Sequence, residues 1–371
     1  MFAQSLARSF QVHSGPVALS IGEQITSWDK MGKLIPSIAK GLNRLGCKPG
    51  SRVALLAGNS PEHLRMMYAI SWAGCILVPL NNRLSPAELS WILADSESIA
   101  LVSDSKHYKV AEELIPKVDS NLITIGLDEN AFGNHQLSEL ASQDSNSAWL
   151  GTETDIGALY YTGGTTGQPK GAMLTQGNLS SNVSQMQLWY GELDQTQEKV
   201  LGILPFFHVF AMTAVMNFAI ASGAQMILLP RYELKQTLNT IHKKKPTIFP
   251  AVPTIYASIN QAANLSKFDL STIRFCISGG APLPLEVKET FERLTGCRLV
   301  EGYGLSETAP VATCNAMRDL NKPGSIGQVM PQTEISIHHI EPPHDPMPMG
   351  ERGEVWIKGP QVMIGYLNRP E

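Results

Sequence analysis

The sequence predicts an α/β fold: two parallel-sheet α/β subdomains of similar architecture, followed by a small β subdomain at the C-terminal end. Two series of short apolar runs alternate with helix-start signals, and such alternation is typical of parallel sheets covered by helices. After Asp319 the chain is rich in Gly and Pro with short alternating strands, which indicates the third unit. The expected units cover residues 1–180, 181–315 and 316–371.

The first series begins at Arg52–Ala57, a short apolar run that predicts a buried strand. Ser60-Pro61-Glu62 then starts a helix, with an N-cap serine and proline in the first turn. Ser85-Pro86-Ala87-Glu88 opens another helix in the same way. Asp128–Thr154 is polar and predicts a loop. Further strands are expected at Ile76–Leu80, Ile99–Ser103 and Ile156–Tyr161.

The second series includes Leu201–Pro230, which contains no Asp, Glu, Lys or Arg and is long enough to span a bilayer. Pro205, Asn217 and Gly223 divide it, so a buried β-α-β unit is favoured over a transmembrane helix. The strands expected in this series are Val200–Leu204, Met226–Leu229, Thr247–Pro250, Arg274–Ser278 and Arg298–Glu301. Those expected in the C-terminal unit are Glu334–His338 and Glu354–Lys358.

Composition limits the functional classes. The chain has 371 residues, 43% hydrophobic and 17% charged, which are globular values, and a net charge of −4 gives no basic face for nucleic acid. The five cysteines are scattered and form no Cys-x-x-Cys pair or zinc-ligand cluster, so reduced, mostly buried thiols in a cytoplasmic protein are expected. Met1–Phe10 lacks the apolar core of a signal peptide.

The segment from Tyr160 to Gly171 concentrates glycines and threonines before Lys170, directly after a predicted strand. Glycines let backbone N–H groups turn toward one point, hydroxyls add donors, and the lysine adds positive charge, as in a polyphosphate cradle. Because Pro169 precedes Lys170 and Gly171 follows it, the segment does not fit the Walker pattern. The alternative is a flexible glycine-rich turn, which its expected place between a strand and a helix start disfavours.

Three ordered motifs resemble those of the adenylate-forming (AMP-binding) superfamily of acyl-CoA synthetases, luciferases and peptide-synthetase adenylation domains. The resemblance extends from about Ser27 to the last residue. The motif sequences are similar to those of bacterial medium- and long-chain fatty-acid–CoA ligases. The motifs are Tyr160–Gly171, Gly302–Thr308, and Gly350–Val355 continued by Gly359–Tyr366.

This resemblance implies a reaction in two steps. ATP and a fatty acid give an acyl-adenylate and pyrophosphate with Mg²⁺, and CoA then takes the acyl group as a thioester. Since the attacking carboxylate is already charged, catalysis reduces to in-line positioning and charge neutralisation. The partners implied are these small molecules. A homodimer and peripheral contact with a membrane remain open.

The resemblance also implies roles for single residues. Lys170, His208 and Glu307 would be catalytic, with Glu307 and the Thr162 hydroxyl on Mg²⁺. Tyr303 would stack on adenine and Ser306 would reach the α-phosphate. Without the surrounding motifs, Glu307 would be interpreted as a glutamate at a helix N-terminus and His208 as a packed core residue. The nucleotide site would comprise Thr162, Gly163, Gly164, Thr165, Thr166, Gly167, Lys170, Gly279, Gly280, Ala281, Glu301, Gly302, Tyr303, Gly304 and Ser306.

The acyl site would be lined by apolar or small residues. An amino-acid substrate would need a carboxylate to balance its buried ammonium, and the absence of acids in Leu201–Pro230 argues against it. Met212 and Met216 belong to the same apolar segment, and the depth of the tunnel is not legible from sequence. The expected acyl-contacting residues are Phe207, His208, Val209, Phe210, Val252, Gly302 and Ala312.

The family continues beyond the point where this chain stops, at Glu371. We therefore expect the large domain of a longer ligase, with an incomplete β subdomain, no mobile C-terminal domain and little activity in thioester formation. Gln176 stands where the family often has histidine. Two alternatives are an enzyme that hands the acyl group to a carrier protein and a non-catalytic nucleotide- or acyl-binding module.

Overall fold

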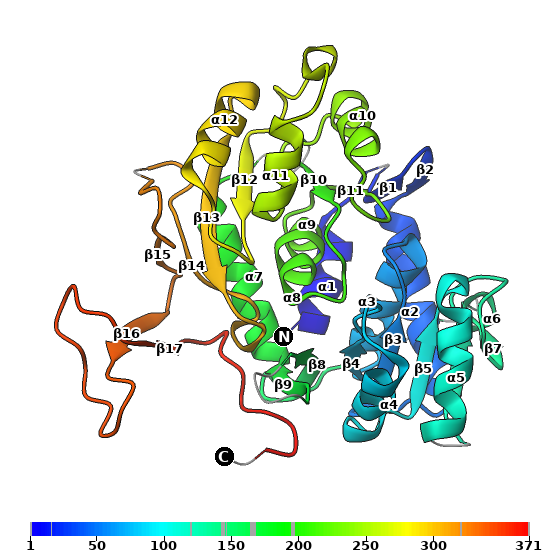
Figure 1. Cartoon of the computed structure of the whole chain (residues 1–371). Helices are drawn as coiled ribbons and strands as arrows, with labels where there is room; N and C mark the ends of the chain where they lie inside the picture. Colours follow the sequence, from blue (N-terminus) through cyan, green and yellow to red (C-terminus); the bar gives the residue numbers. More distant parts are fainter. Residues whose placement is uncertain are drawn as a thin grey trace.

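The computed structural model describes residues 2–15, 17–118, 121–141, 145, 147–163, 168–193, 197–319 and 321–369. Within them, helices pack on two large sheets, and a small hairpin projects from one side (Figure 1). The predicted α/β class is confirmed.

The first sheet has seven strands in the order β7-β6-β5-β3-β4-β8-β9. All neighbours are parallel except β8 and β9, which form an antiparallel hairpin. The central strands are buried along their length because helices cover the sheet. The strands are β3 (Arg52–Leu56), β4 (Ile76–Pro79), β5 (Ala100–Ser103), β6 (Ile123–Gly126), β7 (His135–Gln136), β8 (Ile156–Thr162) and β9 (Lys170–Thr175).

Helix starts in this part follow the predicted caps. The Ser60 hydroxyl accepts from the His63 N–H (3.0 Å) at the start of α3. Ser85 and Glu88 form a capping box at α4, with the Ser85 N–H donating to Glu88 (2.8 Å). The helices are α2 (Trp28–Arg44), α3 (Pro61–Trp72), α4 (Pro86–Asp95), η1 (Ser105–His107), α5 (Tyr108–Val118) and α6 (Leu137–Leu140). The expected loop at Asp128–Thr154 thus contains two short elements, β7 and α6.

The second sheet consists of two four-stranded parts, β10-β11-β1-β2 and β12-β13-β14-β15. Ile248 joins them by single parallel bridges to Val200 and Phe275, so the expected strand at Thr247–Pro250 is reduced to isolated bridges. The strands are β1 (Leu19–Ile21), β2 (Gln24–Thr26), β10 (Lys199–Gly202), β11 (Gln225–Leu228), β12 (Phe275–Ser278), β13 (Arg298–Gly304), β14 (Val311–Cys314) and β15 (Gln328–Val329).

The N-terminal segment belongs to this second sheet, although the expected unit 1–180 assigned it to the first. β1 pairs in parallel with β11, with Leu19 opposite Met226. Before it, α1 (Phe2–Val12) packs on α3, α7 (Gln176–Tyr190) and α9 (Phe218–Ala221). Short-range sequence signals could not reveal this pairing, because its partner lies about two hundred residues away.

The charge-free segment forms the expected buried β-α-β unit. β10 and β11 are parallel neighbours, connected by α8 (Val209–Ala211), the π-helix η2 (Met212–Asn217) and α9. Among the helices of the described residues, none combines the length and apolar character needed to cross a bilayer. The remaining helices are α10 (Leu234–Lys244), α11 (Pro253–Asn260), η3 (Leu265–Lys267), α12 (Leu285–Thr295) and η4 (Ser306–Thr308).

The C-terminal unit is small, as expected. β16 (Glu334–His338) and β17 (Glu354–Lys358) pair as an antiparallel hairpin, which confirms both predicted strands. Beyond the hairpin the chain returns to β9 of the first sheet, where Ala172 bridges Tyr366 (Figure 1).

Candidate active site

The segment proposed to bind phosphate is the connection of a β-hairpin. β8 ends at Thr162, which lies opposite Lys170 at the start of β9. The expectation of a helix directly after this loop was wrong, because α7 starts only after β9. Thr162 and Lys170 are half-buried and Gly163 is exposed, with open space around a Cβ placed there. The four expected residues Gly164, Thr165, Thr166 and Gly167 lie outside the described residues.

The third sequence motif runs beside this hairpin and reaches η4. The Met173 N–H donates to the Gly365 carbonyl (3.0 Å), and the Leu367 N–H donates to the Gly171 carbonyl (2.9 Å). Further back, the Met363 N–H donates to the backbone carbonyl of Glu307 (2.8 Å). The motif therefore links the strand that begins with Lys170 to the turn that carries Glu307.

Tyr366 brings the two charged candidates together. Its hydroxyl donates to Glu307 Oε1 at 2.6 Å, and Lys170 Nζ lies 5.5 Å from the centre of its ring. Burial, together with the neighbouring Glu307 carboxylate, raises the pKa of Tyr366 to about 12. Side chains from all three motifs thus meet at one place.

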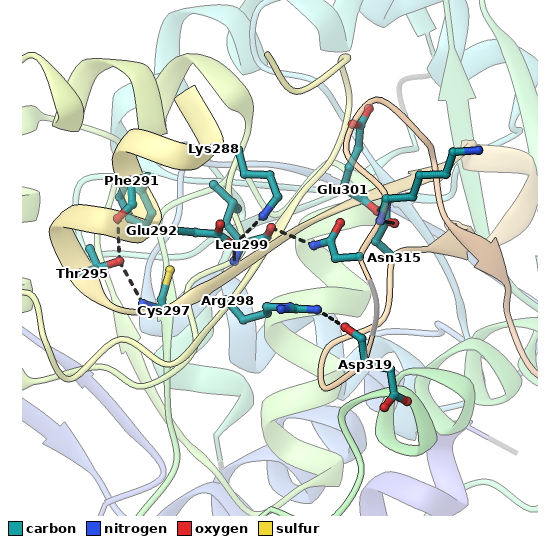
Figure 2. Close-up of polar contacts among 12 residues, drawn as sticks. Lys288, Phe291, Glu292, Thr295, Cys297, Arg298, Leu299, Glu301, Asn315 and Asp319 are labelled. Atoms are coloured by element: carbon teal, nitrogen blue, oxygen red, sulfur yellow. Dashed lines mark hydrogen bonds and ion pairs between the residues drawn. The ribbon is translucent and has the colours of Figure 1, made fainter. Parts of the chain in front are cut away.

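The strand that carries Glu301, Gly302 and Tyr303 is fixed on both sides (Figure 2). At its start, the Leu299 N–H donates to Glu292 of α12 (2.9 Å), while Lys288 pairs with the same carboxylate (2.5 Å). Near its middle, the Glu301 carbonyl accepts from the Asn315 N–H (2.9 Å). Burial raises the pKa of the Glu301 carboxyl, against a hydrogen bond from the Leu283 backbone.

Gly279 and Gly280, expected in the nucleotide site, lie in a loop whose backbone other groups can approach closely. Gly280 has φ of +81°, a backbone conformation that is strained for residues with a side chain. A Cβ placed on Gly279 would lie only 3.2 Å from the Phe210 ring. Ala281 is exposed beside them. The Ser278 hydroxyl, at the end of β12, is buried without a partner among the described residues. This loop therefore offers polar atoms and bare backbone next to Phe210.

The second glycine-bearing strand turns sharply before η4. A Cβ on Gly304 would meet the Pro310 carbonyl oxygen, and a Cβ on Gly302 would lie 3.3 Å from Ile277. Only glycine fits at position 304 without moving the backbone. Tyr303 and Ser306 are half-buried on either side of this turn.

His208 stands at the N-terminal end of α8 with its side chain exposed. Its pKa is lowered, first because neighbouring atoms displace water from the ring and then because of the charge on Arg83. The imidazole is therefore neutral near pH 7. The interpretation as a fully packed core histidine does not hold.

Asn59 fixes the segment just before His208. Its Nδ2 donates to the Leu204 carbonyl (2.8 Å), and its Oδ1 accepts from the Phe206 N–H (2.9 Å). Because Asn59 follows β3, this clamp ties the first sheet to the segment expected to line the acyl site.

Apart from His208 and Gly302, the expected acyl residues divide into two groups. Phe210 and Val252 are half-buried and flank the Gly279–Gly280 loop, where a Cβ on Gly280 would lie 3.7 Å from Val252. Phe207, Val209 and Ala312 are buried in the core. Sequence analysis assigned no role to Tyr366, Asn59 or Arg83. Of these three residues, only Tyr366 could have been found from the sequence, because it is the last residue of the third motif.

The donor set suits a magnesium ion bound together with phosphates. Within the described part of the chain, no cluster of three or more His, Cys, Asp or Glu could hold a metal ion. Mg²⁺ commonly uses one or two carboxylates plus substrate phosphates and water. Glu307 fits this pattern, since Tyr366 donates to Oε1 and no other part of the described chain donates to Oε2.

Comparison with known proteins identifies the family of this chain. The profile of the AMP-binding enzyme family matches residues 6–367. A long-chain-fatty-acid–CoA ligase of Bacillus subtilis is 39% identical, over 94% of this chain and 67% of its own length. A feruloyl-CoA synthase of an Amycolatopsis species is 32% identical, over 95% of this chain and 69% of its own.

A solved structure shares the fold. The ATP-bound crystal structure of MatB from Rhodopseudomonas palustris superposes with a TM-score of 0.88 at 26% identity, covering 100% of this chain and 73% of that one. Since the family profile spans nearly the whole chain, this protein belongs to the AMP-binding enzyme family.

Proposed function

We propose that this protein activates a fatty carboxylic acid with ATP to form an acyl-adenylate, which then gives a thioester with CoA. The observation that carries the proposal is the meeting of Lys170 and Glu307 across Tyr366. Family membership and the Bacillus subtilis relative, named a long-chain-fatty-acid–CoA ligase, support the reaction type.

In this proposal the chain's own residues position reactants and neutralise charge. Lys170, at the end of the hairpin, would offset negative charge on the triphosphate, and Thr162 opposite it would donate a hydroxyl. Glu307 would hold Mg²⁺, which when bound supplies further neutralisation of the phosphate oxygens. Neutral His208 would orient the substrate carboxylate as it attacks the α-phosphate. No residue needs to remove a proton from the acid, because the carboxylate is already ionised.

The adenine would lie against the backbone of Gly279 and Gly280, with Tyr303 across from it. The buried Ser278 hydroxyl and the exposed Ala281 backbone supply polar atoms at that edge. Glu301, Gly302, Gly304 and Ser306 would complete the nucleotide site, with Gly302 also open to the acyl group. Glycine at these positions keeps the surface flat enough for a ring system.

The apolar segment that follows His208 in the chain favours a substrate with an apolar acyl tail. Met212 and Met216 of η2 border a small cavity with Leu77, Ala158 and Leu179 from the first sheet and α7. Methionines adapt to varied apolar shapes, and each buried methylene contributes up to about 0.8 kcal/mol. This apolar lining favours an alkyl tail over a charged one.

Binding of non-hydrolysable acyl-adenylate analogues tests the proposal, because an acyl-sulfamoyl adenosine needs no turnover. Isothermal titration would compare short, medium and long straight-chain tails with a feruloyl tail. We expect affinity to increase with tail length by up to about fourfold per buried methylene. If the feruloyl analogue bound most tightly, the substrate would be an aromatic acid and not a fatty acid. No binding of any analogue would contradict adenylate formation.

A further inference from the structure

We propose that Tyr366 is a positioning residue that holds Glu307 and Lys170 where they act together on a magnesium-bound triphosphate. This inference rests on the proposed function and adds a role for the third motif. Its basis is that one side chain contacts both charged groups, which lie more than a hundred residues apart in sequence.

The hydroxyl sets the orientation of the carboxylate. Glu307 sits in the one-turn helix η4, which by itself fixes a side chain poorly, and its backbone carbonyl is held by the Met363 N–H (2.8 Å). The Tyr366 bond to Oε1, at 2.6 Å, leaves Oε2 without a hydrogen bond from the described residues. Carboxylates that ligate metals are commonly oriented by such an outer hydrogen bond.

The ring sets the position of the ammonium. Lys170 Nζ lies 5.5 Å from the ring centre, within the range of a cation–π attraction. This contact restrains a flexible side chain at the end of the hairpin before any phosphate arrives. Pre-organisation of this kind reduces the ordering that ligand binding must otherwise supply.

The backbone of Tyr366 is itself fixed on β9. Gly365 accepts from Met173 (3.0 Å) and Leu367 donates to Gly171 (2.9 Å), so both neighbours of the tyrosine are hydrogen-bonded to that strand. The strand begins with Lys170. The distance between hairpin and η4 is therefore set through Tyr366 rather than through a loose chain end.

The hydroxyl is the donor in this contact, since its oxygen lies 2.6 Å from Glu307 Oε1. Glu307, which can only accept when ionised, fits this donor.

Two substitutions separate the hydroxyl from the ring. Tyr366→Phe removes the bond to Glu307 and keeps the ring, whereas Tyr366→Leu removes both. Tyr161→Phe is a matched control, because Tyr161 is also half-buried and donates to a carboxylate, Asp95 Oδ2, at 2.7 Å. That carboxylate is at the end of α4 and is not bonded to the hairpin lysine.

The readout is metal binding without turnover. Electron paramagnetic resonance would measure Mn²⁺ affinity in the presence of a non-hydrolysable ATP analogue, and titration calorimetry would measure the analogue alone. We expect Tyr366→Phe to weaken Mn²⁺ binding about tenfold or more while metal-free nucleotide affinity changes little. Tyr366→Leu should also weaken metal-free nucleotide binding about two- to fivefold. Tyr161→Phe should match the wild type in both.

The outcomes distinguish this inference from the function on which it rests. If wild type binds the Mn²⁺–nucleotide complex and Tyr366→Phe binds it equally well, the positioning role is wrong and the proposed function stands. If wild type binds no nucleotide with or without metal, both are wrong. Equal losses in Tyr366→Phe and Tyr161→Phe would also overturn the inference, since they would indicate a general effect of losing a tyrosine hydroxyl.

Discussion

His63 illustrates how the fold sets the charge of a single residue. The ring is buried, Nδ1 donates to the Gly58 carbonyl (2.9 Å), and Nε2 has no partner among the described residues. Burial is the main reason that its pKa is lowered to about 4. The ring edge faces Phe206, close to the Asn59 clamp.

This buried histidine predicts a pH-dependent stability. In the unfolded chain His63 binds a proton below its ordinary pKa of 6.5, and in the folded protein it does so only below a pKa of about 4. The unfolded state holds more protons in that window, so the free energy of unfolding falls as pH falls through it, by up to about 3 kcal/mol. Urea denaturation across this range should show a shallower decline for His63→Gln. His339→Gln, at an exposed histidine, should retain the wild-type decline; equal slopes in all three proteins would contradict the assignment.

Roles for single residues were predicted where a motif and a chemical demand coincided, and these roles stay predictions. Lys170 and Glu307 were proposed as phosphate and metal residues, and the structure places them around one tyrosine. Tyr366 received no role, because its contacts depend on pairing between β9 and a segment almost two hundred residues later. The apolar neighbours of His208 by themselves indicated a packed histidine, whereas its motif implied a role at the acyl site, and the residue is exposed.

At the scale of elements, α7 connects the two sheets and the C-terminal segment. Asn182 is buried and forms two reciprocal bonds with Val311 of β14: Nδ2 donates to its carbonyl (2.8 Å) and Oδ1 accepts from its N–H (3.0 Å). Asn178 donates to the Pro360 carbonyl (2.8 Å). The helix therefore holds the strand after η4 as well as the third motif.

Removing the Asn182 amide should destabilise the protein measurably. Asn182→Ala leaves a buried backbone N–H and carbonyl unpaired, at a cost of about 1–3 kcal/mol for each unsatisfied group. Urea denaturation would give the free energy of unfolding. Ser184→Ala, on the exposed side of the same helix, should change it by less than about 0.5 kcal/mol. A small effect of Asn182→Ala would show that α7 does not hold β14 in place.

Element prediction succeeded where signals were local. Caps at Ser60 and Ser85 located α3 and α4, and apolar runs located β3, β4 and β5. Prediction of elements failed where pairing with a distant strand determines the secondary structure of a segment. Residues 247–250 form only single bridges, and the glycine-rich loop joins two strands because β9 pairs back on β8.

For the whole molecule, three motifs far apart in sequence converge where the first sheet, η4 and the returning C-terminal segment meet. The alternation of apolar runs and helix starts indicated the fold class, but it did not reveal that β1 and β2 complete the second sheet. Long-range pairing is set by burial of both sheets at once, which local patterns do not encode.

The most direct test is a crystal structure of this protein with Mg²⁺ and a non-hydrolysable ATP analogue. We predict that one triphosphate contacts Lys170 while Glu307 Oε2 contacts the metal bound to it, with Tyr366 still donating to Oε1. A nucleotide bound elsewhere, or held by the hairpin with Glu307 turned away from the metal, would contradict the account.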